Sequence, residues 1–231
     1  MAGLFPKWMN ALPTFGAVAG LGGLGAVVLG GWYYLTPDFF EVGYMPQQPG
    51  PVGFSHQIHA GRLGMDCRYC HTNVEKSPDA NVPDVATCMA CHAENKLAGW
   101  DTHRVEFVRE AYAADASIPW RNVHVLPDYV HFPHHVHVNA GVSCYSCHGS
   151  IPGMPEVYQV ESLAMGWCLD CHRNPQQHLV PPELVTDLMT VETQWFQMND
   201  QEREREFRVT SEQLYHSLTD APPQHCSACH Y

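Results

Sequence analysis

All ten cysteines of this chain occur in five copies of the pattern Cys-x-x-Cys-His. Two thiols at this spacing lie about one helical turn apart, so each can bond one vinyl group of a porphyrin while the following histidine binds the iron. The pattern is typical of c-type haem attachment, and it predicts five covalently bound haem c groups. The predicted attachment cysteines are Cys67, Cys70, Cys88, Cys91, Cys144, Cys147, Cys168, Cys171, Cys226 and Cys229, and the predicted iron ligands beside them are His71, His92, His148, His172 and His230.

Two other uses of paired cysteines fit the pattern less well. Structural zinc needs two Cys-x-x-Cys knuckles, or one knuckle with a histidine pair, about 12–20 residues apart. A disulfide framework needs only an even number of cysteines. Neither explains a histidine directly after every second cysteine, so the pattern favours haem over both.

The remaining histidines supply second axial ligands. A low-spin haem iron needs a sixth ligand, usually histidine or methionine. The chain has 16 histidines, and five of them belong to the attachment motifs. The eleven others are His56, His59, His103, His124, His131, His134, His135, His137, His178, His216 and His225. Eleven candidates for five irons predict that every iron is six-coordinate.

A repeated signature assigns four of these ligands. The pattern Phe-x-His-x-x-His begins at Phe54, upstream of the first motif, and again at Phe132, upstream of the third. Such self-similarity indicates a duplicated two-haem unit, at residues 54–100 and 132–180. Residues three apart on a helical turn share a face, so each pair can bind two neighbouring irons. The predicted sixth ligands of the first four haems, in chain order, are His56, His59, His134 and His137; alternatively, one histidine of each pair only packs or forms a hydrogen bond.

The fifth motif, at residues 225–231, has no such signature upstream. Its sixth ligand must come from earlier in the chain or from a partner. We predict His124, within the segment VHVLPD at 123–128. Other candidates are His103, His178, His216, Met154 and Met165.

The N-terminal part contains a candidate membrane anchor. Residues 14–35 form an uncharged stretch of 22 residues, long enough for a helix to span a bilayer. Lys7 precedes the stretch and Asp38 follows it, which predicts a cytoplasmic N-terminus at 1–13 and a haem domain on the periplasmic side. Residues 36–53 are rich in proline and glycine and predict an extended tether to the haem domain at 54–231. A cleaved signal peptide is the alternative, but its cleavage-like Ala17-Val18-Ala19 lies inside the apolar run, so we expect an uncleaved anchor.

Composition predicts an irregular fold. The chain has 18 prolines, 18 glycines and only 16% charged residues, so we expect a multihaem cytochrome c with little secondary structure, in which short α-helices and loops wrap the haems. A net charge of −12 argues against nucleic-acid binding, which requires a basic face. The acidic surface is either simply solvated or docks a basic redox partner.

Several segments together resemble one family. They are FSHQIHA at 54–60, DCRYCH at 66–71, TCMACH at 87–92, VHVLPD at 123–128 and MGWCLDCH at 165–172. They resemble the pentahaem cytochrome c subunit of bacterial alternative complex III, and the resemblance covers essentially the whole chain. It implies a menaquinol-oxidising membrane complex whose partners are an iron–sulfur protein, polytopic quinol-binding subunits and a monohaem cytochrome.

These observations predict an electron-transfer subunit that is not itself an enzyme. Electrons would come from an iron–sulfur or quinol-oxidising partner and leave to a periplasmic cytochrome c or copper protein, in a respiratory or photosynthetic chain. The alternative is a multihaem reductase acting on nitrite or hydroxylamine, or the membrane-anchored donor to one. Such a reductase needs an iron with an open position, which the surplus of histidines disfavours. A free periplasmic shuttle is disfavoured by the predicted anchor.

Overall fold

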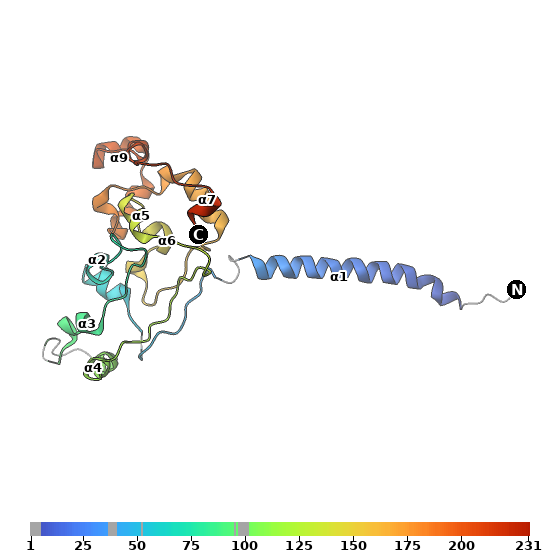
Figure 1. Ribbon diagram of the computed structural model, residues 1–231, viewed down its shortest axis with the longest axis horizontal. Coiled ribbons are helices and arrows are strands. Elements are labelled where there is room, and N and C mark those ends of the chain that lie inside the picture. Colours follow the sequence, from blue (N-terminus) through green and yellow to red (C-terminus); the bar gives the residue numbers. More distant parts are fainter. Residues whose placement is uncertain (1–5, 37–40, 52, 95, 97–101) are drawn as a thin grey trace.

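The computed structural model describes the chain except for residues 1–5, 37–40, 52, 95 and 97–101 (Figure 1). Its α-helices are α1 (Leu12–Leu35), α2 (Cys67–Cys70), α3 (Val85–His92), α4 (Glu106–Ala113), α5 (His134–Asn139), α6 (Tyr145–His148), α7 (Met165–Arg173), α8 (Leu188–Thr193), α9 (Asp200–Phe207) and α10 (Ser211–His216). A π-helical turn, η3, covers Gln57–Arg62. Short 3-10 turns cover Lys7–Ala11, Thr102–Arg104, Ile151–Gly153, Pro175–Gln177, Pro182–Leu184, Trp195–Gln197 and Cys226–Ala228.

Within the described residues no strand forms, and only an isolated antiparallel bridge joins Val142 to Leu179. Most α-helices other than α1 have fewer than nine residues, and long loops connect them. The expected fold of short helices and loops is therefore confirmed. The proline and glycine content explains it, because both residues interrupt regular elements.

Helix α1 extends away from the rest of the molecule as a single rod (Figure 1). The apolar helical stretch Lys7–Leu35 is long enough to cross a membrane, and none of its apolar window is buried by the chain itself. The helix begins two residues before the predicted span because Pro13 fits the first turn of a helix, and it ends at the predicted Leu35. It is a candidate membrane span.

The buried hydrophobic core is small and lies mainly in one segment. Val180, Leu184, Val185, Val191 and Trp195 form a cluster, against which partly buried residues such as Val138 and Tyr145 pack. The indole N–H of Trp195 donates to the carbonyl of Leu179 at 3.1 Å. This core supports the second half of the haem domain.

Most of the charged run at 200–208 forms α9, with a capping box made by Asn199 and Glu202. One of its residues is not simply solvated. The guanidinium of Arg203 lies 4.9 Å above the Trp195 ring and donates to the Trp195 carbonyl at 3.1 Å. Arg203 therefore closes one side of the core.

The predicted domain boundaries remain predictions. Residues 1–5 of the N-terminal segment, 37–40 and 52 of the tether, and 95 and 97–100 of the first two-haem unit lie outside the described residues. The predicted tether contacts the predicted haem domain at Gly43, whose N–H donates to the carbonyl of Gln159 at 2.6 Å.

Candidate haem sites

We number the sites 1 to 5 in chain order, after their Cys-x-x-Cys-His motifs. The first four motifs lie on the short helices α2, α3, α6 and α7, and the fifth begins in the turn Cys226–Ala228. All ten cysteines lie in the described part of the chain and none forms a disulfide. The thiols are therefore available for attachment, and the disulfide framework is not what the structure contains.

At sites 1 and 3 a distant histidine ring faces the histidine of the motif. The ring centres of His56 and His71 lie 6.5 Å apart with planes 1° from parallel. Those of His134 and His148 lie 6.5 Å apart with planes 9° from parallel. The structure thus brings each predicted sixth ligand opposite the fifth ligand of its own site.

Sites 2 and 4 contain the same arrangement with more tilted rings. His59 and His92 have ring centres 5.9 Å apart and planes at 51°. His137 and His172 have ring centres 6.0 Å apart and planes at 43°. The histidines of each Phe-x-His-x-x-His signature therefore face two different motifs.

These separations fit a metal held between two imidazoles. A metal bound to two ring nitrogens at about 2 Å each needs ring centres roughly 6 Å apart. Bare zinc is a poorer fit, because no group of three or more His, Cys, Asp or Glu side chains among the described residues is arranged to hold a metal ion. Facing histidine pairs beside free thiols match covalent haem.

Hydrogen bonds determine which ring nitrogen faces the partner. The Nδ1 atoms of His59 and His134 contact the carbonyls of Ser55 and Pro78 at 2.8 and 2.7 Å. The same contact occurs at His137, at 2.9 Å to Pro133, and at the motif histidines His71, His172 and His230, at 2.6 to 3.0 Å. A carbonyl only accepts, so Nδ1 carries the proton and the Nε2 lone pair is left for iron.

A phenylalanine holds each pair of distal histidines. The ring of Phe54 stacks on that of His59, with ring centres 4.4 Å apart, and meets the ring of His56 edge-on, with ring centres 4.8 Å apart. Phe132 stacks on His137 at 4.3 Å and contacts His134 edge-on at 4.9 Å. The first residue of the signature therefore fixes the angle between the two rings that follow it.

Burial keeps several of these rings neutral. Burial, assisted by neighbouring histidines, lowers the pKa of His56 to about 4 and that of His148 to about 3. Burial also lowers the pKa values of His92 and His137. A neutral imidazole is the form that binds a metal, so these environments favour ligation over protonation.

Comparison with known proteins finds similar sequences among multihaem cytochromes. Residues 52–108, which contain sites 1 and 2, match the family described as cytochrome c7 and related cytochrome c. This chain has the fold of a multihaem cytochrome c. It is 28% identical over 177 residues to the menaquinone reductase multiheme cytochrome c subunit of Nitratidesulfovibrio vulgaris, an alignment that covers 68% of this chain and 80% of that protein.

At site 5 the structure places the rings differently from our expectation. The ring of His124 lies 4.4 Å from His148, at site 3, whereas the ring next to His230 is Tyr129, at 5.8 Å. The segment that precedes His124 is also held by a distant residue: the side-chain amide of Gln48 exchanges two hydrogen bonds with the backbone of Arg121, at 2.9 and 3.0 Å. Gln48 lies 73 residues before Arg121 in the sequence, so the local sequence around His124 does not reveal this contact.

The other candidate sixth ligands lie in varied places. His216 pairs with Glu212 at 3.0 Å, and Met165 is 67% exposed on α7. His178 lines a cavity of about 640 Å³ together with the buried Met154. The neighbours that sequence reasoning missed at site 5 are Tyr129 and His131, whose backbone N–H donates to the Cys229 carbonyl at 2.8 Å. Their only signal was their position directly before the second signature.

Proposed function

We propose that this cytochrome is the electron-transfer subunit of a membrane-bound quinol:acceptor oxidoreductase. The observation that carries the proposal is the set of four facing histidine pairs, because two histidines saturate an iron and leave no position for a substrate. Haem bound in this way supplies reversible one-electron redox chemistry at low potential. The protein contributes covalent anchoring through the cysteines, ligand orientation through the backbone carbonyls, and exclusion of water around the rings.

The chain's partners are proposed on the resemblance to alternative complex III. The complex would contain an iron–sulfur protein, polytopic quinol-binding subunits and a monohaem cytochrome, and a periplasmic cytochrome c or copper protein would accept the electrons. The relative from Nitratidesulfovibrio vulgaris supports a quinone-linked complex, since it is named as a subunit of a menaquinone reductase. Its name gives the reducing direction, whereas the resemblance favours menaquinol oxidation.

Five haem c groups are part of the proposal, one for each attachment motif, with the anchor in the cytoplasmic membrane and the haem domain in the periplasm. Four of the five sites have facing histidine pairs, which supports four bis-histidine irons. Lys7 before α1 supports the orientation, because positive charge favours the cytoplasmic side.

Site 5 favours a second candidate function. The ring of Tyr129 lies beside His230, and within the described residues no histidine ring faces His230 as one does at the other four sites. An iron there without a strong sixth ligand would provide the open position that a nitrite- or hydroxylamine-type reductase requires. The ligand state of the iron at site 5 therefore distinguishes the electron-transfer relay from the reductase.

Purification from native membranes in a mild detergent tests the main proposal. We expect an iron–sulfur protein and polytopic subunits to co-purify, menaquinol to reduce the haems of the complex rapidly, and menaquinol to reduce the isolated subunit slowly. Intact-mass analysis of the denatured chain should show five haem additions. Migration as a single subunit with rapid nitrite or hydroxylamine turnover would replace the relay with the reductase.

A further inference from the structure

Sites 1 and 3 lie directly against each other, although a whole motif separates them in sequence. The two sites bind adjacent backbone carbonyls of one loop. The Cys67 thiol donates to the carbonyl of Thr186 at 3.7 Å, and the backbone N–H of Cys144 donates to the carbonyl of Val185, the residue before Thr186, at 3.2 Å. Pairing with the Cys144 thiol is also the main cause that lowers the pKa of Cys67. In addition, the backbone N–H of His134 donates to Pro78, in the loop after the first motif, at 3.1 Å. The first attachment cysteines of the two units are therefore neighbours.

Within each unit the two sites are neighbours as well. His56 and His59 share the phenylalanine Phe54 and face sites 1 and 2, as His134 and His137 share Phe132 and face sites 3 and 4. Site 2 then has α4 on its outer side, where Arg109 donates to the His92 carbonyl at 2.9 Å. Helix α4 carries no haem motif, so no further site follows site 2 on that side.

Site 5 lies against site 4. Nδ1 of His172 contacts the carbonyl of Pro223 at 2.6 Å, three residues before the fifth motif. On the other side, the N–H of His131 donates to the Cys229 carbonyl, and His131 directly precedes the Phe132 that stacks on His137. Both ligand rings of site 4 are thus linked to the fifth motif.

We propose that the five sites form one line in the order 2, 1, 3, 4, 5, with sites 2 and 5 as the ends where electrons enter and leave. The proposal deepens the proposed function, on which the roles of the two ends rest. Two duplicated units are then joined at their first sites, and the fifth site extends the second unit. Electron tunnelling slows steeply with distance, so electrons would follow these contacts and not the order of the motifs in the chain.

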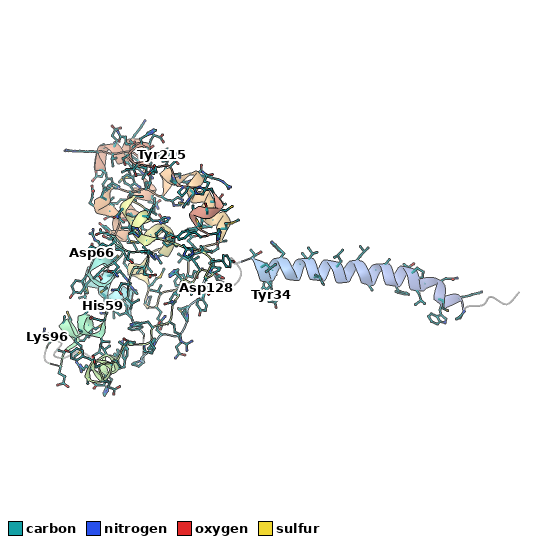
Figure 2. All side chains as sticks on the ribbon, viewed as in Figure 1. Tyr34, His59, Asp66, Lys96, Asp128 and Tyr215 are labelled. Atoms are coloured by element: carbon teal, nitrogen blue, oxygen red, sulfur yellow. The ribbon has the colours of Figure 1, made fainter. Side chains whose placement is uncertain are left out.

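Exposure of the thiols supports the two ends independently. Of the ten cysteines, Cys91 at site 2 and Cys226 at site 5 are exposed, and the other eight are at least partly buried. Figure 1 agrees, since α3 and the C-terminus lie on opposite sides of the domain, with α2 and α6 between them. In Figure 2, Lys96, four residues after His92, lies across the domain from Asp128, the neighbour of Tyr129. A redox partner could therefore approach the attachment sites at either end.

A light-driven electron injection tests the order in the purified holoprotein. Tyr231→Cys introduces a thiol beside site 5, at a residue that is 78% exposed, and a ruthenium photosensitiser is attached there. The haem-bound native cysteines do not take the dye. His56→Met marks site 1 and His59→Met marks site 2, because methionine ligation raises the potential and changes the spectrum of one iron.

From position 231 the site 1 marker should be reduced before the site 2 marker. In the matched control the dye is attached to Glu94→Cys, two residues after His92, and the order of arrival should reverse. Arrival at site 2 before site 1 from position 231, or simultaneous arrival, would overturn the proposed line. If the methionine variants do not fold, iron–iron distances in a holoprotein structure decide: the irons of sites 1 and 3 must be closer than those of sites 2 and 3.

This readout does not depend on the natural reaction, because the electrons are injected by light. Rapid nitrite turnover would overturn the proposed relay function and leave the measured order intact. A wrong order of arrival would overturn the line and leave the relay function intact.

Discussion

The two predicted two-haem units, at residues 54–100 and 132–180, build the same facing-ring geometry by different means. Their ring separations agree within 0.1 Å at corresponding sites. In the first unit, the motif helices α2 and α3 are preceded by N-cap aspartates, Asp66 and Asp84, whose carboxylates accept hydrogen bonds from backbone N–H groups. In the second unit, the N-cap residues of α6 and α7 are Cys144 and Ala164, whose side chains form no capping hydrogen bond.

The second unit is stabilised by burial instead. It packs on the core around Trp195, and burial raises the pKa of its Cys147 thiol to about 12. The comparison teaches that the Phe-x-His-x-x-His signature and the motif determine the ligand geometry locally. The surrounding structure is then free to differ, and with it the polarity that tunes each haem potential.

Removal of the core aromatic should produce the largest difference between the units. Trp195→Ala deletes a side chain with no exposed surface and should lower the free energy of unfolding by about 3–5 kcal/mol. Chemical denaturation measures the loss, and the low-spin signals of sites 3 and 4 should be lost at lower denaturant than those of sites 1 and 2. Met189→Ala, at a residue 52% exposed, is the control and should cost less than about 0.5 kcal/mol. Simultaneous loss of all signals would show that the units share one stability.

The ligand geometry was accessible from sequence and the supporting structure was not. The signatures led to the correct facing partners for His56, His59, His134 and His137, because spacing on one turn is a local property. Whether those rings bind iron stays a prediction. The core residue Trp195 was not foreseen, because its burial depends on contacts with Leu179 and Arg203 made only after folding.

Ligand replacement should affect one site at a time in either unit. His134→Ala and His56→Ala each remove one of two facing rings, so each should convert one of five irons to a high-spin or water-ligated form. Electron paramagnetic resonance of the oxidised protein measures this change, and the signals of the other irons should persist unchanged. His135→Ala is the matched control beside His134. A spectrum with the same low-spin signals as the wild type would remove the mutated residue from the ligand set.

Exchange of the capping residues should make the two units more alike in how their motif helices are stabilised. Ala164→Asp gives α7 the type of cap that Asp84 provides to α3, where the carboxylate accepts from the Thr87 N–H at 2.8 Å. Ala164 has the extended backbone that a capping residue needs, so the free energy of unfolding should rise by about 1 kcal/mol. Asp84→Ala should lower the melting temperature. If neither variant changes the unfolding midpoint, caps do not distinguish the units.

The smallest effect concerns the acid sensitivity of the first unit. Hydrogen bonds from Arg68, with a further one from Thr186, lower the pKa of Asp66 from 3.8 to about 2. The ionised carboxylate therefore stabilises the fold above about pH 4, and this contribution is lost as the pH falls toward 2. Asp66 is 45% exposed, so solvent screening reduces the contribution to about 1 kcal/mol.

Asp66→Asn should accordingly be less stable than the wild type at pH 5–7, and the difference should disappear near pH 2. Denaturant unfolding at a series of pH values measures it, with Glu75, the second partner of Arg68 at 3.2 Å, left in place. Asp170→Asn on α7 is the matched control. Asp170 is 80% exposed and its ion pair with Arg173 is long, at 3.6 Å. This substitution should therefore change the free energy of unfolding by less than about 0.5 kcal/mol at every pH. A constant deficit of Asp66→Asn down to pH 2 would attribute its effect to lost packing against Thr186 and not to charge. The stability of the first unit would then depend on packing, as that of the second unit does. The two units would differ less in how they are stabilised.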